Sequence, residues 1–101
     1  MTNNEKNQIL FMQFVMSLSH AGMIQLGKVI NPVTSKIEKN LAEAKATIDM
    51  LIMLREKTKN NLDKTEEQFL ASSISSLQLN YVDEVESEKN NKIEPEKNQE
   101  T

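Results

Sequence analysis

The candidates for acid–base catalysis are Asp49, His20 and Tyr81. Asp49 lies in an apolar run, where a buried carboxyl could serve as a catalytic acid. Lys45 precedes it by one helical turn, so a structural ion pair is favoured. His20 has no serine and aspartate in a triad-like pattern, and Tyr81 suits a core position. The sequence therefore predicts no catalytic residue, and an enzyme is the least favoured class.

The only local cluster of cations is formed by Lys57 and Lys59, which flank Thr58. One interpretation is an anion site or, with Lys64, a contact for nucleic-acid phosphates. The other is complementation of the negative end of a helix dipole. Phosphate sites usually form at helix N-termini, and this cluster follows a predicted helix instead. Dipole complementation is favoured, and Lys57 and Lys59 are weak anion-binding candidates.

Composition excludes several classes of site. The 101 residues contain no cysteine, one histidine and two glycines, which leaves no disulfide, no zinc set and no glycine-rich phosphate loop. No metal or cofactor is therefore expected. Polar residues interrupt the most apolar stretch, residues 9–30, and Glu5 stands beside Lys6 before it. These features favour a buried helix over a membrane span or an export signal, and predict a cytoplasmic protein.

Hydrophobic periodicity divides the chain into three helices, which predicts an all-α fold. They should cover residues 5–26, residues 36–58 and a segment that begins after Leu62. Apolar residues recur at three- and four-residue spacing, so each helix has one face for a core. The predicted inner faces are Phe11, Phe14, Val15, Leu18, Gly22 and Leu26, then Ile37, Leu41, Ala44, Ile48, Leu51 and Ile52, then Phe69, Leu70, Ser73, Ile74, Leu77 and Tyr81.

The linker after the first helix carries its own signals. Gly27 can adopt the left-handed conformation that ends helices. Pro32 forces its neighbour out of helical geometry, and Thr34 or Ser35 could then cap the second helix.

The turn after the second helix is marked by asparagines. Asn60 or Asn61 can take the left-handed position that usually falls to glycine. Asp63 and Glu66 have the spacing of a capping box, which predicts the start of the third helix.

The composition changes at Asp83. Residues 83–101 contain seven acids and three lysines, and almost no apolar residue. Such a segment cannot bury enough surface to offset its ordering entropy. We therefore expect one helical domain over residues 1–82, close to neutral in charge, and a disordered acidic tail over residues 83–101. The near-neutral domain argues against nucleic-acid binding.

Four stretches of this chain resemble one bacterial family, known as domain of unknown function 1844. They are FMQFVMSLSHAGMIQLG (11–27), NPVTS (31–35), NLAEAKATIDMLIMLREKTKNNL (40–62) and LQLNYV (77–82). The resemblance spans about residues 9–82. Asn60 and Ser35 stand at positions where the family pattern has glycine. The resemblance implies a small helical bacterial protein and implies no activity.

The first helix carries a second apolar stripe beside its inner face, which suggests self-association. This stripe consists of Ile9, Met12, Met16 and Met23. A helix in a solvated three-helix domain needs only one apolar stripe, so a second stripe indicates that the helix is covered on two sides. The second helix also ends in a segment that is apolar nearly all round. We expect a homodimer and rank a non-enzymatic interaction or assembly module first, a nucleic-acid accessory protein second and an enzyme third. The self-interface candidates are Ile9, Met12, Met16, Met23, Met50, Met53 and Leu54.

Overall fold

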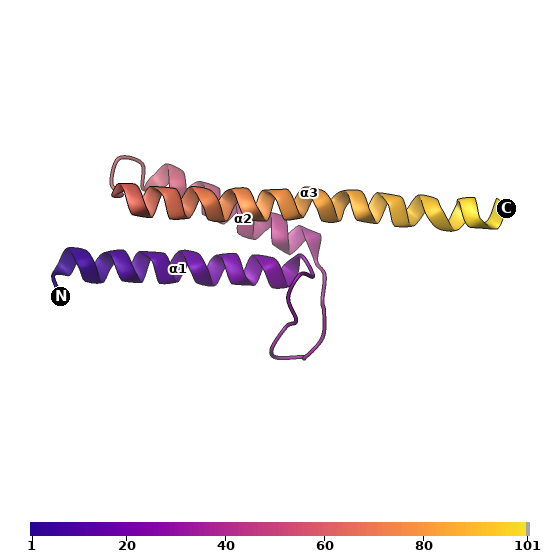
Figure 1. Cartoon of the computed structure of the whole chain (residues 1–101), viewed down its shortest axis with the longest axis horizontal. Helices are drawn as coiled ribbons and strands as arrows, with labels where there is room; N and C mark the ends of the chain where they lie inside the picture. The colour runs from indigo at the N-terminus through magenta and orange to yellow at the C-terminus, as the bar shows by residue number, and fades with distance from the viewer. Residues whose placement is uncertain (101) are drawn as a thin grey trace.

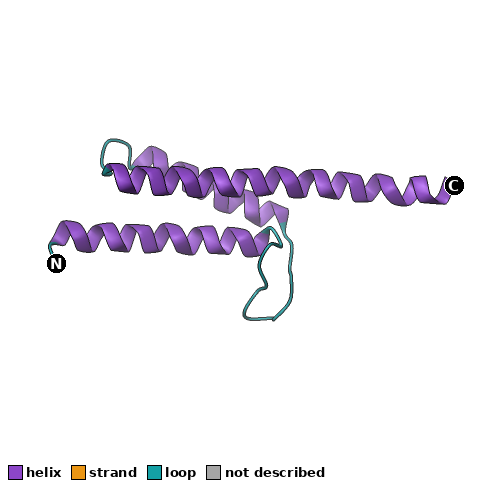
Figure 2. Ribbon diagram, in the orientation of Figure 1, coloured by secondary structure: helices purple, strands orange, loops and turns teal. Residues whose placement is uncertain are grey.

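The computed structural model describes residues 1–100, with side chains described for residues 1–90. It contains three helices, α1 (Asn3–Gln25), α2 (Leu41–Lys57) and α3 (Lys64–Glu100), and no strand among the described residues (Figure 2). The predicted all-α fold with three helices is confirmed.

The helices form a small antiparallel bundle with one core. α1 and α3 run in the same direction and α2 runs between them in the opposite direction (Figure 1). Each helix packs against both others. All three helices, together with Leu26 at the end of α1, contribute fully or almost fully buried apolar side chains. They are Val15, Leu26, Ala44, Ile48, Leu51, Leu70, Ile74 and Leu77.

Two helices begin with a complete capping box. The Thr2 hydroxyl accepts from the Glu5 N–H, and the Glu5 carboxylate accepts from the Thr2 N–H. Asp63 and Glu66 make the same reciprocal pair before α3, at 2.8 and 2.9 Å, as predicted. Each box satisfies two backbone donors that a helix start would otherwise leave free. Because the first box lies at Thr2, α1 begins two residues earlier than expected.

The predicted start of α2 at Lys36 is wrong. Asn40 caps the helix, since its side-chain oxygen accepts from the Glu43 N–H at 3.0 Å. Ser35 cannot serve as a cap because it has a φ of 60°. It belongs instead to a tight turn in which its N–H donates to the Asn31 carbonyl.

Left-handed backbone occurs at two of the predicted helix ends. Gly27 has a φ of 77° after α1, and Asn60 has a φ of 67° in the turn after α2. Both predictions are confirmed. Asparagine is one of the few residues other than glycine that adopts this conformation routinely, which explains how the turn forms without glycine.

Two residues assigned to inner faces are exposed. Phe14 is 53% exposed and Ile37 is 55% exposed. Phe14 lies about 100° around α1 from the buried Val15, so it points beside the core instead of into it. Ile37 precedes α2 and lies in the linker, where helical periodicity does not apply.

α3 continues beyond the expected domain end at Val82. The helix runs to Glu100 and extends past the end of α1 (Figure 1). Residues 83–90 are therefore helical, although the tail prediction covered them. The side chains of residues 91–100 and the whole of Thr101 lie outside the described part of the chain, and so does that part of the tail prediction.

Candidate interaction surface

Four large apolar side chains of α1 and α2 are about half exposed, and we call them the α1–α2 face. They are Leu10 and Phe14 of α1, and Met50 and Met53 of α2. Each is between 47% and 53% exposed. A single exposed apolar residue is ordinary, whereas several on adjacent helices form a patch.

Contacts at the far end of α1 show which of its sides meets α2. Gln25 accepts a hydrogen bond from the Thr47 hydroxyl at 2.6 Å, and its carbonyl accepts from the Asn40 N–H at 2.7 Å. Phe14 lies eleven residues before Gln25, which returns it to nearly the same side of the helix. Phe14 therefore lies on the side of α1 that faces α2.

The antiparallel register places the residues of the two helices opposite each other. Gln25 meets Thr47 at one end of the helix pair, and Phe11 and Thr58 line one pocket at the other end. Residues at the same level of the two antiparallel helices therefore have numbers that sum to about 70. Phe14 is thus level with about residue 56, in the turn of α2 that contains Met53. Leu10 lies one turn before Phe14 and Met50 lies one turn before Met53, so the four side chains follow one another along the helix pair.

The seven residues predicted as one self-interface are divided between α2 and the side of α1 that faces away from α2. Met50 and Met53 belong to the α1–α2 face, and Leu54 packs partly buried against the core beneath it. The remaining four, Ile9, Met12, Met16 and Met23, follow the opposite side of α1. Leu10 is exposed as well and was not among the predicted residues, and Phe14 was wrongly assigned to the core. The helical angles of both residues relative to Val15 place them on its flank.

The opposite side of α1 faces a row of hydroxyls on α3. Met23 and Ser19 line a cavity of about 230 Å³ with Ser72, Ser73 and Ser76 of α3. The buried Ser19 hydroxyl has no hydrogen-bond partner among the described residues. Ile9 and Met16 are 46% and 54% exposed on this side. Phe69 and Leu77 of α3 line the same cavity, the first partly buried and the second fully buried, so α3 adds no exposed large apolar side chain there.

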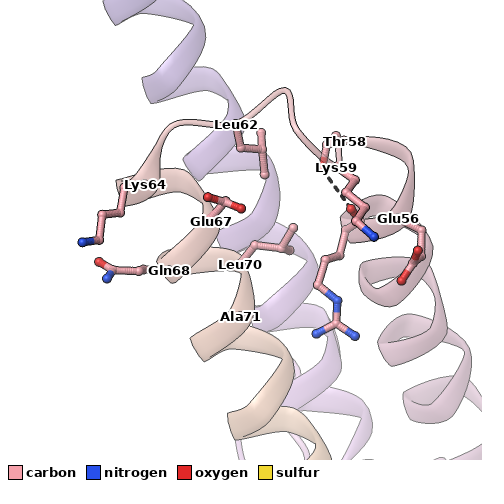
Figure 3. Close-up of a pocket in the computed structure, with 10 residues that line it drawn as sticks. Glu56, Thr58, Lys59, Leu62, Lys64, Glu67, Gln68, Leu70 and Ala71 are labelled. Carbon is pink, nitrogen blue, oxygen red and sulfur yellow. Dashed lines mark hydrogen bonds between the residues drawn. The ribbon is translucent and has the colours of Figure 1, made fainter.

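The predicted cation cluster is divided. Lys59 and Lys64 line a groove of about 520 Å³ between α2 and α3, in which Leu62 and Leu70 also take part. They lie on opposite sides of it, with Lys64 directed outward (Figure 3). Glu56 and Glu67 line the same groove, so its charge is mixed. Lys57 is not among the lining residues, and the three lysines do not form one cationic surface.

The three acid–base candidates lie in separate environments. Asp49 accepts from Lys45 at 3.2 Å on the exposed surface of α2, as predicted for a structural ion pair. His20 is exposed on α1. Tyr81 packs against the core from α3. The structure does not bring these groups together.

One carboxylate ties the linker to α3. Glu84 accepts from Lys28 at 2.5 Å and from Lys39 at 2.6 Å, and its side chain is 12% exposed. These two hydrogen bonds lower the pKa of Glu84 below its ordinary value. The bonds that Lys28 donates to Glu84 and Asp83 raise the pKa of Lys28. Lys28 follows α1 and Lys39 precedes α2, so Glu84 marks where α3 leaves the bundle.

The fold and its surface define a small three-helix protein with an exposed apolar face between its first two helices. No helix in the described part of the chain has the length and apolar character needed to cross a membrane. The chain belongs to the family described as domain of unknown function (DUF1844), whose model matches residues 8–84. Comparison with curated proteins and with solved structures gives no match.

Proposed function

We propose that this protein is a non-enzymatic assembly module that binds a second copy of itself through the α1–α2 face. The observation that carries the proposal is that two adjacent helices leave four large apolar side chains, Leu10, Phe14, Met50 and Met53, each about half exposed. Methionine and phenylalanine suit such a role, because methionine adapts its shape to a partner and an aromatic ring buries a large area.

The size of the face matches one half of a dimer interface. Four large side chains at half exposure leave on the order of 400 Å² of mostly apolar surface, which is about the size of the largest, often functional, patch on a typical monomer. A standard interface buries about 800 Å² per partner, and rather more than half of that area is apolar. The face would thus supply most of the apolar area that a stable dimer needs. Lys57 and Ser17 lie at its edge, where interfaces are usually polar.

Two substitutions on α1 form a matched test. Phe14→Glu and Met16→Glu introduce the same charge on the same helix, at positions 53% and 54% exposed, on opposite sides. We expect sedimentation equilibrium at micromolar concentration to give a dimer for the wild type and for Met16→Glu. Phe14→Glu should be a folded monomer, because its carboxylate would be desolvated in the interface. The double variant Met50→Glu, Met53→Glu should be monomeric as well, since it changes the same face from α2.

Circular dichroism controls for folding in each variant. A monomeric wild type would overturn the proposal. If Met16→Glu were monomeric and Phe14→Glu remained dimeric, the interface would lie on the side of α1 that faces α3 instead.

A further inference from the structure

The α1–α2 face ends in lysines on one side. Lys6 lies one turn before Leu10 on α1, and Lys57 lies one turn after Met53 on α2. Because the two helices are antiparallel, both lysines belong to the same end of the face. Glu56, beside Lys57 in sequence, lines the groove between α2 and α3 on the other side of α2. We call this part of the face the lysine end.

The opposite end of the face carries acids. Glu38 and Glu43 line a hollow of about 400 Å³ between α1 and α2, together with Ala21 of α1. Lys39 also lines the hollow, and its ammonium group binds Glu84 of α3 at 2.6 Å. Two acids therefore stand beside one lysine that already has a partner. We call this part of the face the acidic end.

The spacing on α2 places one charge of each sign at equal distances from Met50. Glu43, Met50 and Lys57 are separated by seven residues each, so they share one side of the helix. At 1.5 Å per residue, each charged residue lies about 10 Å along the axis from Met50. A rotation of half a turn about Met50 exchanges the acid with the base.

We propose that two copies pair on this face in an antiparallel arrangement, about a two-fold axis perpendicular to the helices and close to Met50. The inference rests on the proposed self-association and specifies its geometry. In this arrangement α2 lies on the α2 of the other copy, and Lys57 of each copy meets Glu43 of the other. A two-fold axis parallel to the helices would instead place α1 of one copy on α2 of the other. The lysine ends of the two copies would then lie side by side. Opposite potentials across an interface favour the first arrangement.

The hollow at the acidic end provides a second argument for this axis. The register across the helix pair sets Met50 level with about residue 20 of α1, six residues beyond Phe14. The rotation therefore carries Phe14 to the level of Gln25 on the other copy, and Gln25 lines the hollow. A projecting aromatic ring then lies over a recess, which gives the close packing that stable interfaces have.

The projecting part of α3 favours the same geometry. After the Glu84 ion pairs, α3 continues through residues 85–100, which at 1.5 Å per residue is about 24 Å of helix. The segment begins with exposed acids at Glu86 and Glu88. An antiparallel dimer directs the two acidic helices to opposite ends, whereas a parallel dimer places them at the same end. Like charges at one end are unfavourable, most of all at low ionic strength.

Two residue pairs distinguish the arrangements by distance. With the axis at Met50, Lys57 of one copy lies near Glu43 of the other and far from Asn7. With a parallel axis, α2 lies on α1 of the other copy, and Lys57 is then closer to Asn7, at the same end of the face. Glu43 lies at the opposite end in that case.

The chain has no cysteine, so single-cysteine variants report one position each. Lys57→Cys, Glu43→Cys and Asn7→Cys are prepared separately, and Lys57→Cys is given a mass tag. Pairs are mixed, allowed to exchange subunits and treated with a short bis-maleimide reagent. We expect a tagged–untagged covalent dimer from Lys57→Cys with Glu43→Cys, at several times the yield of any variant alone. The mixed dimer still keeps one Lys57–Glu43 pair, because each variant changes only one of the two residues.

The matched control is Lys57→Cys with Asn7→Cys, which should remain at the level of the single variants. Stronger cross-linking of this pair would overturn the antiparallel arrangement while the dimer stands. The antiparallel arrangement would also be overturned if all three variants had the mass of a dimer and neither mixture gave a cross-link. A monomeric mass for the wild type would overturn the proposed function instead.

Discussion

The two sides of α1 look alike in sequence and differ in what the neighbouring helix places beside them. Each side leaves two large apolar side chains about half exposed, Leu10 and Phe14 on one and Ile9 and Met16 on the other. On the first side, α2 adds exposed methionines. On the second, α3 adds serines together with Phe69 and Leu77, and these two apolar side chains are partly and fully buried. An apolar patch therefore arises from two helices together, and the periodicity of one helix does not identify it.

Truncation of Leu77 should have the largest effect on the free energy of unfolding, because this side chain lies in the well-packed contact between α1 and α3. Leu77 is fully buried, and its Cδ2 would lie 2.8 Å from a Cβ placed on Gly22. Leu77→Ala removes packed methyl groups between α1 and α3 and should reduce the free energy of unfolding by about 3 kcal/mol. Urea denaturation at fixed protein concentration measures it. A loss below about 1 kcal/mol would show that this interface is loosely packed.

Truncation on the two sides of α1 should separate binding from folding. Phe14→Ala removes a large half-exposed ring from the proposed interface, and we expect the dimer dissociation constant to rise at least about tenfold, as for an interface hot spot. Met16→Ala, at equal exposure, should leave it within about twofold. Sedimentation over a concentration series measures both. Equal effects of the two substitutions would remove the distinction between the sides.

Gly22→Ala tests how closely α1 and α3 approach. The added Cβ would lie 2.8 Å from Leu77 Cδ2 and 3.5 Å from Thr47 Cγ2. Overpacking of this kind typically costs about 1–3 kcal/mol, and the better helix propensity of alanine returns about 1 kcal/mol. We expect a net loss of about 1 kcal/mol in urea denaturation. Increased stability would mean that the Leu77 side chain moves aside freely.

Local signals in the sequence predicted the short turn between α2 and α3 and failed for the linker before α2. Asn60, Asp63 and Glu66 act within a few residues of one another, so their types and spacing determine the conformation. The start of α2 depends on a competition between Ser35 and Asn40 as caps. That competition is decided by the left-handed conformation of Ser35 and by the bond from the Asn40 N–H to Gln25 in another helix.

The candidate surface was only partly predictable for a related reason. Helical angles identify which residues of α1 avoid the core, and they could have assigned Phe14 to a flank. They do not state that Met50 and Met53 of α2 lie beside it, because that depends on the antiparallel register of two helices. Glu84 shows the same limit. Composition assigned it to a disordered tail, whereas contacts with Lys28 and Lys39, distant in sequence, place it at the edge of the bundle.

The Glu84 ion pairs should make the stability of the α3 side depend on pH. The pKa of Glu84 is lowered in the folded state, so its contribution to stability is complete above the unfolded value, near 4.5, and is lost as pH falls through the folded value. We expect Glu84→Gln to lower the melting temperature by a few degrees at neutral pH, with the difference shrinking below about pH 4.5. Differential scanning calorimetry over a pH series measures it. A difference independent of pH would indicate that packing of the side chain dominates.

Substitution of Ser19 should have the smallest effect and the opposite sign. Its hydroxyl is buried beside the α3 serines and has no hydrogen-bond partner among the described residues. Ser19→Ala removes the desolvation cost of that group, and alanine also favours the helix, so stability should rise by up to about 1 kcal/mol. Ser17→Ala is the control, because the Ser17 hydroxyl already donates to the Gln13 carbonyl at 3.0 Å. If Ser19→Ala were destabilising in urea denaturation, the hydroxyl would be hydrogen-bonded in solution, and the serine row on α3 would be a polar contact that fixes α1 instead of a surface that merely allows its approach.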